Sequence, residues 1–191
     1  MTSAGEKYAY SWFAKADDYN YAAGQYGLVF YVGGSAETLY CANSVTVTTS
    51  SGAVVTRNPD QMYNIFTANA AKTDKFAYEL TVVNGKITAV KVLALTTATV
   101  NNADINGYVG LDSNTTVDNY NTAYVWNVAV GGNGVADTPA KGDVIYYYAG
   151  DLNNNYAYDA MWIGVNAPGT AAPTPGGYTG NWWWIPGITT P

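Results

Sequence analysis

Short runs of strand-forming residues separated by turn residues dominate this sequence, and the clearest run spans residues 75–93. Asn84-Gly85 lies at its centre, and both residues tolerate the positive φ of a type I′ turn. The turn predicts a hairpin that pairs Val82 with Ile87 and Leu80 with Ala89. One face of the hairpin is expected to enter the core, and it carries Phe76, Tyr78, Leu80, Val82, Ile87, Ala89 and Leu93.

Runs of the same kind recur along the chain, and they determine the expected fold class. They lie at residues 8–13, 26–32, 38–41, 45–49, 53–56, 123–130 and 144–149. Alternating or β-branched runs of this length, bounded by Gly, Asn and Ser, favour antiparallel strands. Residues 61–71 are the segment where we expect one helical turn. The sequence therefore predicts an all-β fold of one or two small barrel-like or sandwich-like units, rich in antiparallel hairpins.

Four segments are expected along the chain. Residues 1–23 form an N-terminal strand or extension, residues 24–95 a first β unit and residues 96–166 a second. Both units end in hairpins of similar layout, which indicates a weak internal repeat, although any all-β chain has a comparable rhythm. Prolines and glycines concentrate from residue 167 onward, so residues 167–191 are expected to be an extended linker with a Trp-rich tail.

Several of these runs carry a family resemblance. Residues 76–90, FAYELTVVNGKITAV, resemble the recurrent Y-x-L-x-x-x-x-G-K-I-T-A-V hairpin of bacterial S-layer and S-layer-homology-associated surface proteins, especially those of Gram-positive gut anaerobes. Residues 26–32, 114–117 and 141–148 are similar to other strands of such modules. The likeness covers roughly residues 24–165 and implies β-barrel or sandwich modules strung along a wall-attached polypeptide. The helical wall-anchoring repeats of that family are not seen in this sequence.

The composition excludes some partners and indicates a location. Eight basic and 14 acidic side chains give a formal net charge of -6, and Arg57 is the single arginine. A nucleic-acid partner is not expected, because binding it needs clustered Lys and Arg. No apolar run approaches the ~20 residues of a membrane span. Low charge and abundant Thr, Asn and Tyr favour an extracellular or cell-surface protein, although residues 1–7 lack the apolar core of a signal peptide, so an exported chain would be a fragment.

Catalysis and cofactors are not expected from these residue types. Histidine is absent, which excludes Ser-His-Asp and Cys-His arrangements and imidazole-bound zinc. Cys41 is expected to be a small buried residue. Paired carboxylates stay formally open, but acidic residues such as Asp60 and Glu79 fall in expected turns or on solvent faces. The sequence therefore predicts a protein that is not an enzyme.

One loop is a candidate calcium site. Asp151, Asn153 and Asn155 alternate as oxygen ligands do in a calcium loop, but the sharp-turn Gly and terminal Glu of an EF-hand are missing. The alternative interpretation is an ordinary hairpin turn. Calcium is the one cofactor that this sequence leaves open.

Aromatic residues are the most informative excess, with 18 Tyr and 6 Trp. Trp12, Trp126 and Trp162 lie in expected strands and are assigned to the core. Trp182, Trp183 and Trp184 follow the linker and are the candidate interaction residues, because contiguous apolar side chains mark partner surfaces. Tyr and Trp both combine apolar area with a polar group, which suits interfaces and sugar platforms.

The sequence therefore predicts a non-catalytic structural module of an S-layer-like surface protein that mediates assembly or display. Its expected partners are copies of itself or neighbouring surface proteins. A carbohydrate-binding or adhesive module using Tyr and Trp platforms is one alternative, with polysaccharide as the partner. A fibre or pilus-like subunit is another. Coplanar exposed rings along a groove would favour sugar, whereas rings buried between chains would favour assembly.

Overall fold

The computed structural model describes residues 5–32, 35–105, 108–111, 116–117, 125–127, 135–136, 140–148 and 161–163. Strands make up most of this part of the chain, together with one helix, so the predicted all-β class is confirmed. The chain divides into two compact units, Met1–Leu95 and Thr96–Pro191.

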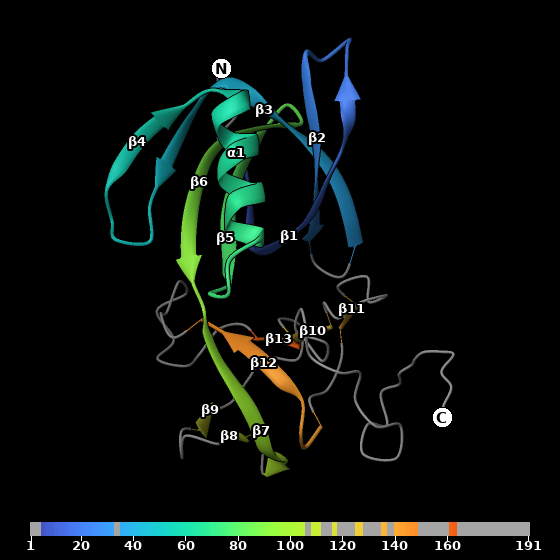
Figure 1. Cartoon of the computed structure of the whole chain (residues 1–191), viewed down its shortest axis with the longest axis vertical. Helices are drawn as coiled ribbons and strands as arrows, with labels where there is room; N and C mark the ends of the chain where they lie inside the picture. Colours follow the sequence, from blue (N-terminus) through green and yellow to red (C-terminus); the bar gives the residue numbers. More distant parts are fainter. Residues whose placement is uncertain are drawn as a thin grey trace. The chain divides into compact units, whose positions relative to one another are not determined.

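The first unit is a closed five-stranded barrel (Figure 1). Its strands are β1 (Glu6–Asn20), β2 (Gln25–Val32), β3 (Ser35–Thr48), β5 (Phe76–Val83) and β6 (Lys86–Ala94). They follow the order β1-β2-β3-β6-β5, and β5 pairs back onto β1 to close the ring. All pairs are antiparallel except β3 with β6. With a helix between the third and fourth barrel strands, this is the Greek-key arrangement of an OB-fold.

A hairpin and a helix are inserted between β3 and β5. Strand β4 (Val54–Arg57) folds back on the end of β3, and the helix α1 (Pro59–Ala70) follows it. In the view of Figure 1, α1 stands between the β3–β4 hairpin and the β1–β2 hairpin. The helix contacts β1, β2 and β3, so it packs against three of the barrel strands.

Local signals explain why α1 is a full helix of 12 residues, where the sequence analysis expected only one turn. The Asn58 side chain accepts a hydrogen bond from the Gln61 amide, and the Gln61 side chain accepts one from the Asn58 amide, both at 2.9 Å. This reciprocal capping box, with Pro59 in the first turn, fixes the helix start. Met62 and Phe66 are four residues apart, and both are fully buried, so one face of the helix seals the core.

The barrel interior is an apolar core centred on aromatic rings. Phe66 of α1 stacks on Phe13 at 5.5 Å and meets Phe30 and Tyr78 edge to face at 5.1 and 4.8 Å. Aliphatic residues from every barrel strand except β1 complete the core, namely Leu28, Leu39, Val45, Val47, Leu80, Val82, Ile87, Val90 and Val92, with Cys41 among them. The helix is therefore an integral part of the core.

The predicted hairpin at Asn84-Gly85 is confirmed, but its register differs after two pairs. Both turn residues have positive φ, 51° and 75°, and Val82 pairs with Ile87. A bulge at Thr88 then adds one residue to β6, so Ala89 pairs with Thr81 and Leu80 pairs with Val90.

The shift changes which β6 side chains enter the core. Val90 and Val92 do so, whereas Ala89 is only half-buried. The predictions of the Leu80 pairing and of Ala89 on the core face were therefore wrong, because a bulge inverts the alternation of side chains. Leu93 is buried, as predicted, but not on the face of the main core cluster.

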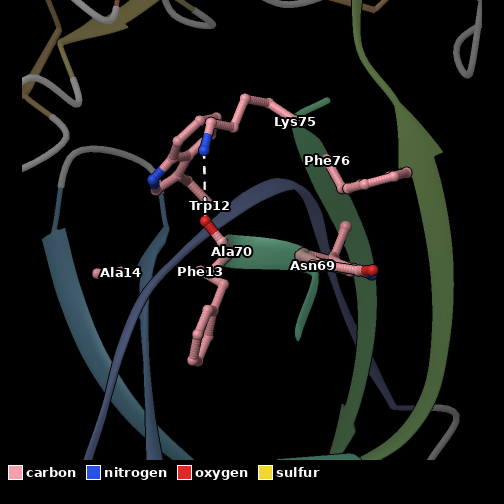
Figure 2. A pocket seen from close by; sticks show the side chains of 8 residues that line it. Trp12, Phe13, Ala14, Asn69, Ala70, Lys75 and Phe76 are labelled. Atoms are coloured by element: carbon pink, nitrogen blue, oxygen red, sulfur yellow. Dashed lines mark hydrogen bonds between the residues drawn. The ribbon is translucent and has the colours of Figure 1, made fainter. Parts of the chain in front are cut away.

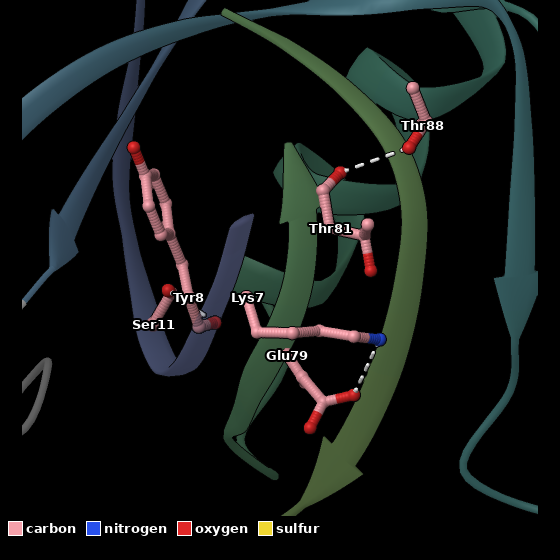
Figure 3. Close-up of polar contacts among 6 residues, drawn as sticks. All are labelled: Lys7, Tyr8, Ser11, Glu79, Thr81 and Thr88. Atoms are coloured by element: carbon pink, nitrogen blue, oxygen red, sulfur yellow. Dashed lines mark hydrogen bonds and ion pairs between the residues drawn. The ribbon is translucent and has the colours of Figure 1, made fainter. Parts of the chain in front are cut away.

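At two of the irregularities in the strand pairing of the barrel, a side-chain hydroxyl bonds a backbone carbonyl (Figure 3). The Thr88 hydroxyl donates to the Thr81 carbonyl at 3.3 Å. Strand β1 has an extra residue between Tyr8 and Ser11, where Tyr10 takes a φ of 56°, and the Ser11 hydroxyl donates to the Tyr8 carbonyl at 3.1 Å. A carbonyl displaced from the ladder thus keeps a hydrogen-bond partner.

The second unit contains a mixed seven-stranded sheet in the order β11-β10-β13-β12-β7-β8-β9. Its strands are β7 (Thr96–Ile105), β8 (Tyr108–Leu111), β9 (Thr116–Val117), β10 (Val125–Asn127), β11 (Val135–Ala136), β12 (Val144–Tyr147) and β13 (Met161–Ile163). Ala98 and Val100 of β7 and Ile145 of β12 are buried. The buried Asp143 carboxylate accepts a 2.8 Å hydrogen bond from the Ala140 amide and fixes the turn before β12.

Candidate functional site

Four tyrosines form an exposed group at the β1–β2 turn, which we call the tyrosine cluster: Tyr19, Tyr21, Tyr26 and Tyr63. Tyr19 and Tyr26 are directly opposite each other in β1 and β2, with ring centroids 5.1 Å apart. Tyr21 meets Tyr19 edge to face at 5.1 Å, and Tyr63 of α1 stacks on Tyr26 at 4.3 Å. The Tyr21 residue is 90% exposed and Tyr19 is 38% exposed. The cluster therefore extends from a half-buried base to an almost fully solvated ring.

Asn20 makes the turn beneath these rings rigid. Its side-chain oxygen accepts hydrogen bonds from the Ala22 and Ala23 amides at 3.0 Å, and its carbonyl accepts one from Gly24 at 2.8 Å. Gly24 has a φ of 69°, a conformation that favours glycine. The Asn20 amide nitrogen also donates to the Tyr40 hydroxyl of β3 at 2.9 Å, which ties the turn to the barrel. Tyr21 is thus exposed on a fixed backbone.

Charged groups beside the cluster are few and partly paired. Asp17 lies 3.2 Å from the Lys15 ammonium and accepts a 3.4 Å hydrogen bond from Thr38. Asp18 is exposed in the same strand. The surroundings of the tyrosine cluster are therefore weakly acidic, as is the whole chain with its net charge of -6.

A second feature is a pocket of about 140 Å³ near the C-terminal end of α1, which we call the aromatic pocket (Figure 2). Its side chains come from β1, α1, the loop after α1, and β5, and they include Trp12, Phe13, Asn69, Lys75, Phe76 and Tyr78. Phe13 and Tyr78 are buried and form the base, whereas the other four are half-buried. Burial also raises the pKa of the Tyr78 phenol to about 12, so this group stays neutral at physiological pH.

Hydrogen bonds hold the polar side of the aromatic pocket. The Lys75 ammonium donates to the carbonyl of Ala70, the last residue of the helix, at 3.3 Å and to the carbonyl of Lys72 in the following loop at 2.9 Å. The Asn69 amide donates to the Tyr78 hydroxyl at 3.2 Å and accepts from Lys72 at 3.0 Å.

Cys41 is buried, as predicted, and its burial disfavours the thiolate form. Its side chain is 0% exposed, and burial raises the pKa of the thiol to about 12. The buried Gln25 side chain donates to the Cys41 carbonyl at 3.0 Å and accepts from its amide at 2.7 Å. The β3–β6 ladder has a register shift between Cys41 and Thr46, and these bonds satisfy the Cys41 backbone beside that shift, so we assign Gln25 and Cys41 a structural role.

Metal and membrane sites can be assessed only for the described ranges. There, no group of three or more His, Cys, Asp or Glu side chains gathers in a way that suits a metal ion. In the same ranges, no helix has both the length and the apolar character needed to cross a bilayer.

The structure reports on few of the predicted site residues. The calcium candidates Asp151, Asn153 and Asn155 lie outside the described residues. So does the predicted interaction group of Trp182, Trp183 and Trp184. The backbones of Trp126 and Trp162 pair directly across β10 and β13. Trp12, assigned to the core from the sequence, is half-buried at the aromatic pocket.

The tyrosine cluster was not predicted from the sequence. Tyr19 and Tyr21 alternate just before Gly24, and this local pattern could have predicted tyrosines at an exposed hairpin turn. No local signal connects Tyr63 with Tyr26, because that contact depends on how α1 packs on the barrel. The same is true of Lys75 and Trp12 at the aromatic pocket.

Comparison with protein-family models, with curated proteins and with solved structures gives no match for this chain. The strand order of the first unit places it among barrels of OB-fold topology, and topology alone does not assign a function.

Proposed function

We propose that this chain is a non-catalytic structural module of an S-layer-like cell-surface assembly, and that its copies contact one another through the tyrosine cluster. The observation that carries the proposal is the Tyr21 ring, 90% exposed on a turn fixed by Asn20. When a partner covers a large ring that a rigid backbone holds in water, apolar surface leaves the solvent and the free energy of the complex falls. Rigid aromatic side chains are also typical anchors of interfaces, because little side-chain entropy is lost on binding.

The chemistry of the chain supports a non-catalytic role. Histidine is absent from the whole sequence. The single thiol is buried, and its pKa of about 12 leaves it protonated. General acid–base and nucleophilic catalysis mostly use groups that titrate near neutral pH.

The arrangement of the rings favours a protein partner over a sugar at this cluster. The Tyr19 ring lies at 70° to that of Tyr21 and at 83° to that of Tyr26, so the exposed rings cross instead of forming one plane. A sugar platform needs a flat aromatic surface, whereas crossed rings leave gaps that side chains of a second protein fill. Edge-to-face contacts of this kind are common in protein interfaces.

The expected stabilisation can be worked out for a two-fold contact. Burying one tyrosine ring contributes about 2 kcal/mol. In a two-fold dimer each surface occurs twice, so a Tyr21→Ala substitution removes two rings and costs about 4 kcal/mol, or about 1000-fold in Kd. Because copies carry the same negative charge, association is expected to strengthen as salt screens that charge.

Sedimentation equilibrium of the purified chain tests the proposal. The wild type is expected to self-associate in the micromolar to millimolar range, and Tyr21→Ala is expected to shift it to monomer. Val54→Ala is the matched control, because Val54 is also an exposed apolar residue, 66% exposed, on the β3–β4 hairpin. Electron microscopy of concentrated samples then shows whether the association builds ordered arrays. A chain that stays monomeric at about 1 mM, or one that Val54→Ala dissociates while Tyr21→Ala does not, would contradict the proposal.

A further inference from the structure

The tyrosine cluster holds an almost fully solvated ring against a second exposed ring of the same chain. Tyr21 is 90% exposed and Tyr19 is 38% exposed, and their ring centroids lie 5.1 Å apart. The Asn20 side chain between them accepts hydrogen bonds from the Ala22 and Ala23 amides, which fixes the backbone that carries both tyrosines. Two phenols are therefore kept side by side where an oxidant in solution reaches them.

Within the cluster, the pair of Tyr19 and Tyr21 is the one best suited to a bond between rings. The two rings now cross at 70°, and the Tyr21 side chain can turn between rotamers because water surrounds almost all of it. An edge carbon of its ring can thus meet an edge carbon of Tyr19. Tyr26 lacks this freedom, since its half-buried ring is stacked on Tyr63 of α1 at 4.3 Å and 22°.

Sulfur groups, which peroxides oxidise readily, do not compete with these phenols. Among the described residues of the first unit, the sulfur-containing side chains are Cys41 and Met62, and both are 0% exposed. We propose that Tyr19 and Tyr21 of one chain are a site of oxidative cross-linking, at which a peroxidase and hydrogen peroxide create a dityrosine bond. Both rings belong to the same chain, so the proposal does not rest on self-association.

Two one-electron oxidations form the bond. Each phenol gives one electron to the peroxidase and its hydroxyl proton to water, which leaves a phenoxyl radical with unpaired density on the ring carbons next to the C–O bond. One such carbon of each ring joins the other. The hydrogen on each joined carbon leaves as a proton and each oxygen takes up a proton, so both phenols are restored. The chain loses two hydrogen atoms, and their electrons and protons reduce one hydrogen peroxide to two water molecules.

The test treats the full chain at about 0.1 μM with a heme peroxidase and hydrogen peroxide. Two groups on one short segment have an effective concentration of about 1 mM, so coupling within a chain should exceed coupling between chains by about 10,000-fold. Trypsin cleaves after Lys15 and Arg57, and the peptide between these sites carries Tyr19 and Tyr21. Mass spectrometry should find this peptide lighter by two hydrogen atoms, together with the fluorescence of dityrosine.

Phenylalanine variants locate the bond. Tyr21→Phe and Tyr19→Phe each keep the ring but remove the hydroxyl that must give up its proton, so each should abolish the loss of hydrogen from this peptide. Tyr8→Phe is the matched control, because it removes the same hydroxyl from a half-buried tyrosine outside the cluster and should leave the yield unchanged. Circular dichroism first establishes that each variant is folded.

Three results would overturn the proposal: an unchanged mass of the wild-type peptide, a loss of hydrogen that persists in Tyr21→Phe, or covalent dimers as the main product at this dilution. Sedimentation equilibrium of the untreated variants separates this proposal from that of assembly. Tyr21→Phe keeps the apolar ring and should still self-associate, whereas Tyr21→Ala should not. A chain that forms the bond but stays monomeric at high concentration would contradict assembly alone.

Discussion

Replacing Phe66 with alanine removes the side chain by which α1 is anchored in the barrel. Phe66 is 0% exposed and contacts three rings, Phe13, Phe30 and Tyr78, at 4.8–5.5 Å. If the helix is part of the core, the free energy of unfolding of the first unit should fall sharply.

The size of this effect follows from burial and ring contacts. Truncation of a buried phenylalanine to alanine costs about 3–5 kcal/mol. Each aromatic pair adds about 0.5–1.5 kcal/mol beyond the buried area, and Phe66 makes three. We therefore expect a loss of about 5 kcal/mol for Phe66→Ala. Phe66→Leu keeps most of the volume and should cost about 2 kcal/mol.

Urea denaturation combined with amide hydrogen exchange over residues 5–95 measures the loss within this unit. Asn64→Ala is the control, since Asn64 is exposed on the same helix and should change stability by less than about 0.5 kcal/mol. A loss below about 1.5 kcal/mol for Phe66→Ala, or equal losses for the Ala and Leu variants, would refute the assignment of α1 to the core.

Three further changes are expected to alter stability. Gly85→Val places a β-branched residue at a φ of 75° and should cost about 1–3 kcal/mol in urea denaturation, whereas Gly85→Asn should be tolerated; an unchanged midpoint for the Val variant would contradict the turn. Asn58→Ala removes the capping box and should cost about 1 kcal/mol and lower the helical circular dichroism signal; no change in either would mean that the cap is unimportant. The pKa of Cys41 rises from 9.0 to about 12 and that of Tyr78 from 10.0 to about 12. Because the folded state holds these protons more tightly, their contribution is complete below pH ~9 and is lost as pH rises towards ~12, by up to about 1.4 kcal/mol per pH unit and group. In the wild type the urea midpoint should start to fall near pH ~9, where the unfolded Cys41 loses its proton. In Cys41→Ala only Tyr78 contributes, so the fall should start near pH ~10. Identical profiles for the variant and the wild type would contradict the assignment.

The sequence predicted the strands and the hairpin turn because those depend on neighbouring residues. Asn84-Gly85 can be recognised from backbone preference alone, and the pairing of Val82 with Ile87 follows from it. The bulge at Thr88 could not be predicted, because it depends on the curvature that closes the barrel. The same limit applies to the pairs of β1 with β5 and of β3 with β6, which join segments distant in sequence.

The candidate sites were harder to predict than the fold. Both the tyrosine cluster and the aromatic pocket combine β-strand residues with residues of α1, as Tyr26 with Tyr63 and Trp12 with Asn69. The cap at Asn58 and Gln61 was visible in the sequence, but the strand-like neighbours of the segment concealed the full helix. The position of a helix on a barrel is set by its buried face, here Met62 and Phe66, and not by its exposed residues.

Hydrogen exchange at low and high protein concentration tests the central claim most directly, because it locates the surface through which copies meet. If the tyrosine cluster is that surface, amides of residues 18–27 and 59–67 should gain protection in the concentrated sample. Tyr21→Ala should remove the gain without changing protection of the barrel core. Protection that appears at the β3–β4 hairpin instead, or that persists at the cluster in Tyr21→Ala, would contradict the account.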